Sequence, residues 1–268
     1  RSYFTTPGGI TVTRTMTSVP FLEGMDDLLD RLETRRGFYL SSGYEYPGRY
    51  SRWDIASVCP PLEIIGRGRE MEFRPLNQRG ELLAQMLFPL LEEHPHWESI
   101  RLEDGVIRGV LKPLPAMFPE ERRSKQPSAF SILRRLIEEF RVCEDPHLGL
   151  VGAFGYDLLF QFDPIELRHP RGVHNDLHLF FCDDIVFMDR RKEVIERWQY
   201  DFDFGAASTL GLERGGEALE KTDGFTPGEI VCDHTAEEYK ANVDIVREGM
   251  RRGDYYEVVL RRTYSTPF

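Results

Sequence analysis

The chain has 268 residues, enough for one large domain or for one domain and part of a second. Hydrophobic residues make up 41% and charged residues 29%, a balance typical of folded globular proteins and not of disordered ones. The formal net charge of −11 disfavours nucleic acid as a partner, because an acidic surface repels phosphate groups. No apolar run reaches the roughly 18 residues of a membrane span, and no signal peptide is visible, so we expect a cytoplasmic protein without membrane contact.

The spacing of the metal-binding residue types predicts no metal site. The cysteines are widely separated and form no CxxC pair, which predicts buried free thiols at Cys59, Cys143, Cys182 and Cys232. Histidines that lie close together in sequence have the surroundings of helix ends and loops. We interpret them as surface residues: His94 with His96, and His174 with His178.

The first hundred residues read as short strands with two amphipathic helices. Apolar residues at helical spacing predict a helix over 22–35, and the apolar run 38–40 predicts a buried strand. A second, leucine-rich helical pattern covers 80–92. Asp104-Gly105 predicts the turn of a hairpin over 99–111. Short apolar runs broken by proline and glycine predict further strands at 52–58, 62–66 and 70–75.

The middle of the chain continues this mixture of helices and hairpins. After a polar, proline-rich loop at 113–127, the hydroxyl of Ser128 is the expected cap of another amphipathic helix. A long β-type run covers 177–188, and 192–202 is its expected hairpin partner. Antiparallel hairpins interspersed with helices are typical of the α+β class. We therefore predict an α+β fold, an antiparallel β-sheet or sandwich with flanking helices.

Composition divides the chain near residue 205. Small and polar residues dominate 203–230, where glycine, alanine, serine, threonine and glutamate are frequent. Such a change in composition is typical of a linker or a domain boundary. We therefore predict one domain at 1–204, a linker at 205–230 and the start of another domain at 231–268.

The last segment has clear helix signals. Thr235 and Glu238 have the spacing of a capping box, and Gly253 is the expected end of the helix. A strand is expected over 256–264. Apolar residues at helical spacing predict a buried stripe, made of Tyr239, Val243, Val246 and Met250. One helix and one strand cannot bury their apolar faces without partners, so we expect this chain to be a piece of a longer protein.

No single segment predicts an active site, but several segments in order resemble one family. Phe38-Tyr-Leu-Ser-Ser42 and the block 44–54 look like the start of the large subunit of anthranilate synthase. They are closest to the fused bacterial form, which continues into a glutamine amidotransferase. Later blocks resemble the family's glycine-rich segment ending in Gly-Tyr-Asp, its following strand, and the opening of its chorismate-binding domain: 149–162, 183–189, and 238–243 with 253–260. The resemblance implies that 1–204 is a tryptophan-sensing regulatory domain and that 231–268 begins the catalytic domain.

The resemblance also implies an effector site in the first of these blocks. In the family, a Leu-Leu-Glu-Ser stretch helps to bind tryptophan, the end product that inhibits the enzyme. The matching residues here that are implied to bind tryptophan are Leu40, Ser41 and Ser42. Ser41 stands where glutamate is usual, and a hydroxyl binds an ammonium group less strongly than a carboxylate does. The alternative interpretation is that both serines only end a strand and begin a turn.

Glu257 bears on the nucleophile of the implied reaction. Related enzymes that add water to chorismate resemble this segment but carry a water-activating lysine just before Val-Val-Leu, where this chain has Glu257. A glutamate beside an anionic substrate is a poorer choice of base, so the resemblance favours ammonia over water. The alternative interpretation is a surface or cross-strand carboxylate. We assign no catalytic residue in this chain, and we expect the family's Mg²⁺ ligands beyond residue 268.

The activity that the resemblance implies is that of a carbon–oxygen lyase of tryptophan biosynthesis. It converts chorismate and glutamine-derived ammonia to anthranilate and pyruvate, with Mg²⁺ as cofactor, L-tryptophan as inhibitor and a glutamine amidotransferase domain or subunit as partner. The chain by itself is expected to be inactive. Two alternatives remain open: a related chorismate enzyme that makes aminodeoxychorismate or aminodeoxyisochorismate, and a stand-alone amino-acid-binding module. A homodimer also remains open.

Overall fold

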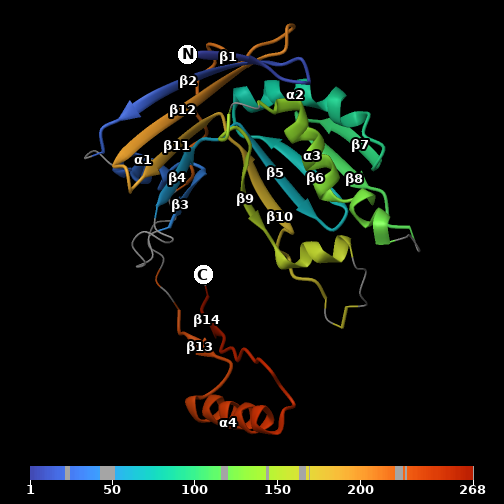
Figure 1. Cartoon of the computed structure of the whole chain (residues 1–268), viewed down its shortest axis with the longest axis vertical. Helices are drawn as coiled ribbons and strands as arrows, with labels where there is room; N and C mark the ends of the chain where they lie inside the picture. The colour runs from blue at the N-terminus through green and yellow to red at the C-terminus, as the bar shows by residue number, and fades with distance from the viewer. Residues whose placement is uncertain are drawn as a thin grey trace. The chain divides into compact units, whose positions relative to one another are not determined.

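The computed structural model of the chain describes residues 1–21, 25–42, 52–115, 120–142, 145–162, 167–168, 170–220, 226 and 228–267. Contacts divide the chain into two compact units, Arg1–Leu219 and Glu220–Phe268. Antiparallel sheets with flanking helices make up the first unit, which confirms the predicted α+β class (Figure 1). Several sequence expectations fall outside the described ranges: most of the block 44–54, Cys143, and residues 221–225 of the expected linker.

Two six-stranded sheets form the framework of the first unit as far as the chain is described, and all neighbouring strands are antiparallel. The first sheet has the order β1 (Ser2–Thr5), β2 (Thr11–Val19), β12 (Val194–Asp203), β11 (Asp184–Asp189), β4 (Trp53–Val58) and β3 (Gly37–Ser41). The second has the order β7 (Trp97–Glu103), β8 (Val106–Leu111), β6 (Glu70–Pro75), β5 (Leu62–Arg67), β10 (Leu177–Phe181) and β9 (Leu150–Phe154). Strands β3 and β9 therefore lie at sheet edges.

Two neighbouring strands carry the chain from one sheet to the other. β4 pairs with β11 in the first sheet, and their continuations β5 and β10 pair in the second. Cys59 makes the turn between β4 and β5 with a φ of +57°, which is uncommon for a residue other than glycine. The prediction of one continuous run over 177–188 is wrong. The chain changes sheet at Cys182 and Asp183, where the buried Asp183 carboxylate pairs with Arg79.

Helices cover the second sheet and one edge of the first. α2 (Gln78–Glu92) packs on β5, β6, β7 and β8, and α3 (Ala129–Phe140) lies beside α2 (Figure 1). α1 (Asp26–Leu32) packs on β3 and β4. The described ranges also contain the short 3₁₀ helices η2 (Glu120–Lys125) and η3 (Tyr156–Gln161). Both sheets, α2 and α3 contribute to one apolar core, whose members include Val12, Phe73, Leu87, Leu136, Phe181 and Tyr200.

The two main helices begin in different ways. The side-chain oxygen of Asn77 accepts a hydrogen bond from the Gly80 N–H (3.0 Å), an ordinary N-cap for α2. The predicted hydroxyl cap at Ser128 is wrong, because the Ser128 side chain makes no cap hydrogen bond. Instead, the Ala129 N–H donates to the side-chain oxygen of Gln161 (2.9 Å). A residue far away in sequence thus provides the acceptor for a backbone N–H that has no partner within the first turn of α3.

A buried arginine ties residues beyond 204 to the first unit. Arg79 is fully buried and ion-pairs with Asp183, while its guanidinium also donates to the carbonyl oxygens of Thr209 (2.6 Å) and Leu212 (3.1 Å). The backbone N–H of Leu219 donates to a carbonyl near α1, that of Thr34 (2.8 Å). Residues 205–219, which we expected to begin a linker, thus pack on the first unit, and the division between units falls at 219/220.

The second unit is small. It contains β13 (Val231–Cys232), α4 (Ala236–Arg252) and β14 (Tyr264–Ser265), with β13 and β14 antiparallel. Both halves of the predicted capping box are present, and Gly253 ends α4 with a φ of +82°. The predicted strand over 256–264 is wrong, since only Tyr264 and Ser265 form β14. The predicted buried stripe is also wrong for this structure, because Tyr239, Val243 and Val246 are only half-buried and Met250 is 44% exposed.

Candidate functional site

The residues predicted to bind an effector lie at the end of the edge strand β3. Its register with β4 places Ser41 opposite Asp54 and Leu40 opposite Ile55. Because side chains alternate along a strand, Tyr39 and Ser41 share one face and Leu40 lies on the other. The Leu40 side chain is 47% exposed, so it presents apolar surface to solvent.

The buried carboxylate of Asp54 organises the face that carries Ser41. It accepts hydrogen bonds from the hydroxyls of Tyr39 (2.8 Å) and Ser41 (3.0 Å) and from Nε of Arg190, which lies 3.0 Å from both carboxylate oxygens. Burial raises the pKa of Asp54, but the hydrogen bonds from Arg190, Tyr39 and Ser41 lower it, and the pKa lies below its ordinary value. Asp54 is therefore ionised at neutral pH and already has donors on both oxygens.

Ser41 bridges an anion and a cation. Its hydroxyl donates to Asp54 and accepts from Nη2 of Arg190 (3.3 Å). The Arg190 side chain is 42% exposed, so its guanidinium keeps donors open to solvent. The carboxylate beside Ser41 is satisfied while the cation is partly accessible, which favours an anionic group of a ligand at this position.

The hydroxyl of Ser42 is used by the protein itself. It donates to the carbonyl oxygen of Trp53 (2.7 Å) and accepts from the backbone N–H groups of Trp53 (3.1 Å) and Arg52 (3.3 Å). The backbone N–H of Ser42 also donates to the Trp53 carbonyl (3.2 Å). These contacts fix the start of β4 against the end of β3, so Ser42 positions the strand ends, as the alternative interpretation of this serine expects.

A second arginine–carboxylate pair lies next to the first. Arg52 donates through Nε and Nη2 to Asp189 (2.8 Å for Nη2), and its guanidinium lies 4.5 Å from the ring centroid of Trp53. The hydrogen bonds from Arg52 lower the pKa of Asp189. Because Trp53 and Asp54 begin β4 while Asp189 ends β11 and Arg190 follows it, the two pairs hold these strand ends together. This cluster was missed in the sequence, where nothing indicates that 52–54 and 189–190 are neighbours.

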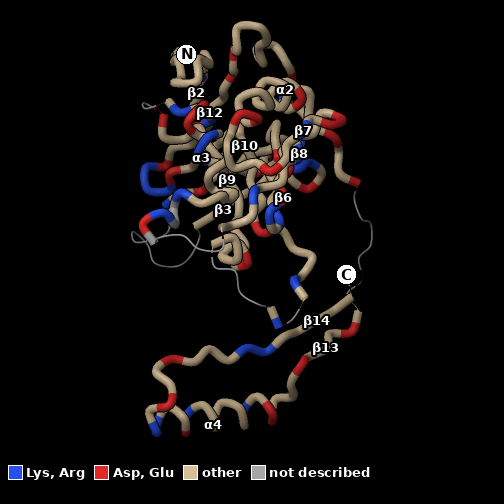
Figure 2. Tube along the Cα trace, turned by 90° about the vertical axis from the view of Figure 1, so that its right-hand side faces the viewer, with Lys and Arg blue, Asp and Glu red and all other residues tan. Residues whose placement is uncertain are grey.

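Arginine pairing extends to every acidic side chain that is buried in the described part of the chain. The pairs are Asp54–Arg190, Glu63–Arg36, Glu139–Arg135, Asp145–Arg14, Asp176–Arg171, Asp183–Arg79, Asp184–Arg197 and Asp189–Arg52. Basic and acidic positions are accordingly interspersed along the trace (Figure 2). Carboxylates engaged in this way are not available as ligands, and the residues that the structure describes contain no group of three or more histidine, cysteine or acidic side chains able to hold a metal. The described residues therefore do not fit the Mg²⁺ that the resemblance implies.

The other residues singled out in the sequence lie apart from this cluster. Glu257 belongs to the second unit, where it is exposed and outside regular secondary structure. Cys59 and Cys182 are buried free thiols, and Cys232 is a partly buried one. Burial raises the pKa of Cys182 to about 12, so this thiol is neutral and unreactive. None of the helices within the described ranges is long and apolar enough to cross a membrane.

Comparison with known proteins identifies the family. A family model described as chorismate binding enzyme matches residues 91–268. The chain is 39% identical over 268 residues to an anthranilate synthase of Azospirillum brasilense, covering 98% of this chain and 36% of that protein. It is 26% identical over 243 residues to the pyocyanine-specific anthranilate synthase component 1 of Pseudomonas aeruginosa, covering 84% of this chain and 44% of that protein. The chain thus spans less than half the length of either relative.

The matched span includes α3, most of the second sheet and the whole second unit. The similarity to the Azospirillum protein extends over 98% of the chain, beyond the span that the family model matches. Both relatives carry the same activity in their names. On these grounds the chain belongs to the chorismate-binding enzymes and is of the anthranilate synthase component I type.

Proposed function

We propose that this chain is the N-terminal part of an anthranilate synthase of tryptophan biosynthesis. The observation that carries the proposal is the 39% identity over 98% of the chain to a protein named for that activity. The reaction converts chorismate and ammonia to anthranilate, pyruvate and water, and glutamine supplies the ammonia through an amidotransferase domain or subunit. Mg²⁺ belongs to the proposal for the whole protein, with ligands outside this chain.

Product analysis of the full-length protein tests this proposal. Chorismate with glutamine, and chorismate with ammonium salt, should each yield anthranilate and pyruvate in equal amounts. Aminodeoxychorismate or aminodeoxyisochorismate as the product, without pyruvate release, would contradict the proposal and favour the related enzymes. We expect the 268-residue chain alone to produce neither, and turnover by the purified chain would refute the expected inactivity.

We further propose that the β3 edge contributes to a tryptophan site that lowers activity. Two features on one face of β3 support it: the Ser41 hydroxyl and the partly accessible guanidinium of Arg190. Arg190 would bind the effector carboxylate beside Ser41, whereas the exposed Leu40 lies on the opposite face of this edge strand. Because Asp54 is already satisfied by its donors, an effector ammonium gains less here than from the family's usual glutamate, and we expect comparatively weak binding.

Calorimetric titration of L-tryptophan, with D-tryptophan as control, tests the effector proposal. Stereoselective binding to the full-length protein that is weakened about tenfold by Arg190→Gln would support it. Arg101, an exposed arginine of β7, gives the matched control Arg101→Gln, which should bind as the wild type does. Equal binding by all three proteins, or no binding at all, would contradict a tryptophan site at the β3 edge.

A further inference from the structure

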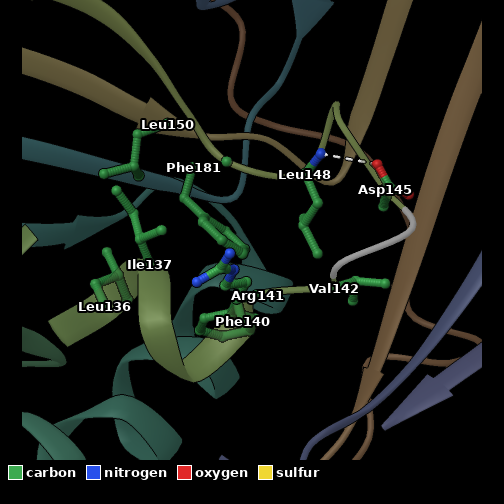
Figure 3. Close-up of a pocket in the computed structure, with 10 residues that line it drawn as sticks. Leu136, Ile137, Phe140, Arg141, Val142, Asp145, Leu148, Leu150 and Phe181 are labelled. Carbon is green, nitrogen blue, oxygen red and sulfur yellow. Dashed lines mark hydrogen bonds between the residues drawn. The ribbon is translucent and has the colours of Figure 1, made fainter. Parts of the chain in front are cut away.

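A cavity of about 240 Å³ lies between the C-terminal end of α3 and the start of β9. Its walls are apolar side chains of α3, β9, β10 and the segment before β9, among them Leu136, Phe140, Leu148, Leu150 and Phe181 (Figure 3). The rings of Phe140 and Phe181 lie 4.7 Å apart between centroids and make one wall rigid. An apolar cavity of roughly 150 Å³ can hold benzene, so this one has room for an aromatic ring with a short substituent.

Arg141 brings a positive charge to this apolar cavity. It follows the last residue of α3, and Figure 3 shows its guanidinium extending among the drawn apolar side chains. The Arg141 backbone N–H bonds to the Glu138 carbonyl (3.4 Å), but within the described residues its guanidinium has neither an ion pair nor a hydrogen bond. Arg141 is an exposed residue, whereas the arginines that pair with buried acids are already engaged, so its guanidinium is a cation that a ligand anion in the cavity can reach.

The anion that also lines the cavity, Asp145, is already satisfied. Its carboxylate accepts hydrogen bonds from Arg14 (3.1 Å), the Tyr200 hydroxyl (3.0 Å), and the backbone N–H groups of His147 (2.8 Å) and Leu148 (3.1 Å). Three of these bonds go to Oδ1, and Oδ2 is ion-paired with Arg14, so a ligand's ammonium group would have to share Oδ2 with Arg14. Burying an amine here without a partner would cost free energy.

We propose that the α3–β9 cavity binds a small apolar monocarboxylate, such as an arylalkanoic acid. The ligand's ring fills the space against Phe140 and Phe181, and its carboxylate pairs with Arg141. The cavity selects against zwitterionic amino acids, because the charge of Asp145 is already paired with Arg14 and their ammonium group would gain little there. This site is separate from the proposed tryptophan site, since the residues concerned lie on α3, β9 and β10 and not on β3.

Calorimetric titration of 3-phenylpropionate into the full-length protein tests the proposal, with L-phenylalanine as the matched zwitterion. We expect 3-phenylpropionate to bind and Arg141→Gln to weaken it about tenfold, equivalent to about 1.4 kcal/mol. Arg134, exposed on the same helix and not part of the cavity lining, gives the control Arg134→Gln, which should bind like the wild type. L-Phenylalanine should bind at least tenfold more weakly than 3-phenylpropionate.

A second variant tests the location without touching charge. Ile137 lines the cavity but is 46% exposed, so Ile137→Trp can fill the space with little effect on the core. We expect this variant to stay folded and to lose binding of 3-phenylpropionate. The proposal is overturned if saturable binding is absent up to about 10 mM in the wild type, if Arg141→Gln binds as well as Arg134→Gln, or if L-phenylalanine binds as tightly as the acid.

Discussion

Replacing Arg79 with methionine should destabilise the first unit strongly. The guanidinium is 1% exposed and pairs with Asp183, whose side chain is also 1% exposed, and with Asp201 (3.0 Å). Removing one partner of a buried ion pair costs about 3–5 kcal/mol, because the other charge is left without compensation. The carbonyl oxygens of Thr209 and Leu212 would lose donors as well, so we expect a loss of about 4 kcal/mol. That is a large fraction of the roughly 5–15 kcal/mol that stabilises a typical domain.

Urea unfolding followed by tryptophan fluorescence measures this loss. All three tryptophans, Trp53, Trp97 and Trp198, lie in the first unit, so the signal reports on that unit. With a urea dependence of about 2 kcal/mol per molar, the midpoint should fall by about 2 M. Arg101→Met, at a side chain 62% exposed, should shift the midpoint little.

The double variant Arg79→Met, Asp183→Leu separates the pair from the packing around it. A buried pair replaced by apolar residues of similar volume is often neutral, so the double variant should recover most of the lost stability. Burial already raises the pKa of Asp183, whereas Arg79 lowers it. Without Arg79 the ionised form of Asp183 is therefore still less favourable in the folded state. A carboxyl whose pKa is higher in the folded state than in the unfolded state destabilises the fold once the pH rises above the unfolded pKa. The stability that Arg79→Met loses relative to the wild type should therefore shrink as the pH falls from 7 towards 4. A loss below about 1 kcal/mol in the single variant would refute the reasoning.

Three further predictions concern other positions. The pKa of Asp54 is lowered in the folded state, so its ion pair stabilises the fold at pH values above the unfolded pKa. The difference in urea midpoint between the wild type and Asp54→Asn should therefore shrink as the pH falls from 6 through the folded pKa of Asp54. Asn77→Ala removes the cap of α2 and a bond to the Gly215 carbonyl, and should cost about 1–2 kcal/mol in the same unfolding assay. Iodoacetamide at pH 8 should label Cys232 well before Cys182 in the folded chain, as mass spectrometry would show; equal labelling would contradict the burial of Cys182.

Local signals in the sequence predicted local structure well. Asp104-Gly105 specified the β7–β8 turn because both residues adopt positive φ, at +51° and +77°. The capping box at Thr235 and Glu238 likewise marked the start of α4. In each case the residues that determine the conformation are sequence neighbours.

Features set by distant contacts could not be predicted in the same way. The break at Asp183 depends on Arg79, about a hundred positions earlier in the chain, and α3 begins on the side chain of Gln161 and not on the hydroxyl of Ser128. At the candidate site, the sequence indicated Ser41 but not Arg190, which reaches it only because β11 pairs with β4. Residues 205–219 resembled a linker in composition because part of their contacts is made by the backbone carbonyls of Thr209, Leu212 and Gly215, which composition does not reveal.

Inhibition of the full-length enzyme by tryptophan tests the central claim most directly. Anthranilate formation from chorismate and glutamine is followed by fluorescence while L-tryptophan is added to wild type and to Arg190→Gln. We expect L-tryptophan, and not D-tryptophan, to lower the rate of anthranilate formation, and Arg190→Gln to need about tenfold more inhibitor for the same effect. Failure to form anthranilate, or equal inhibition of both proteins, would contradict it.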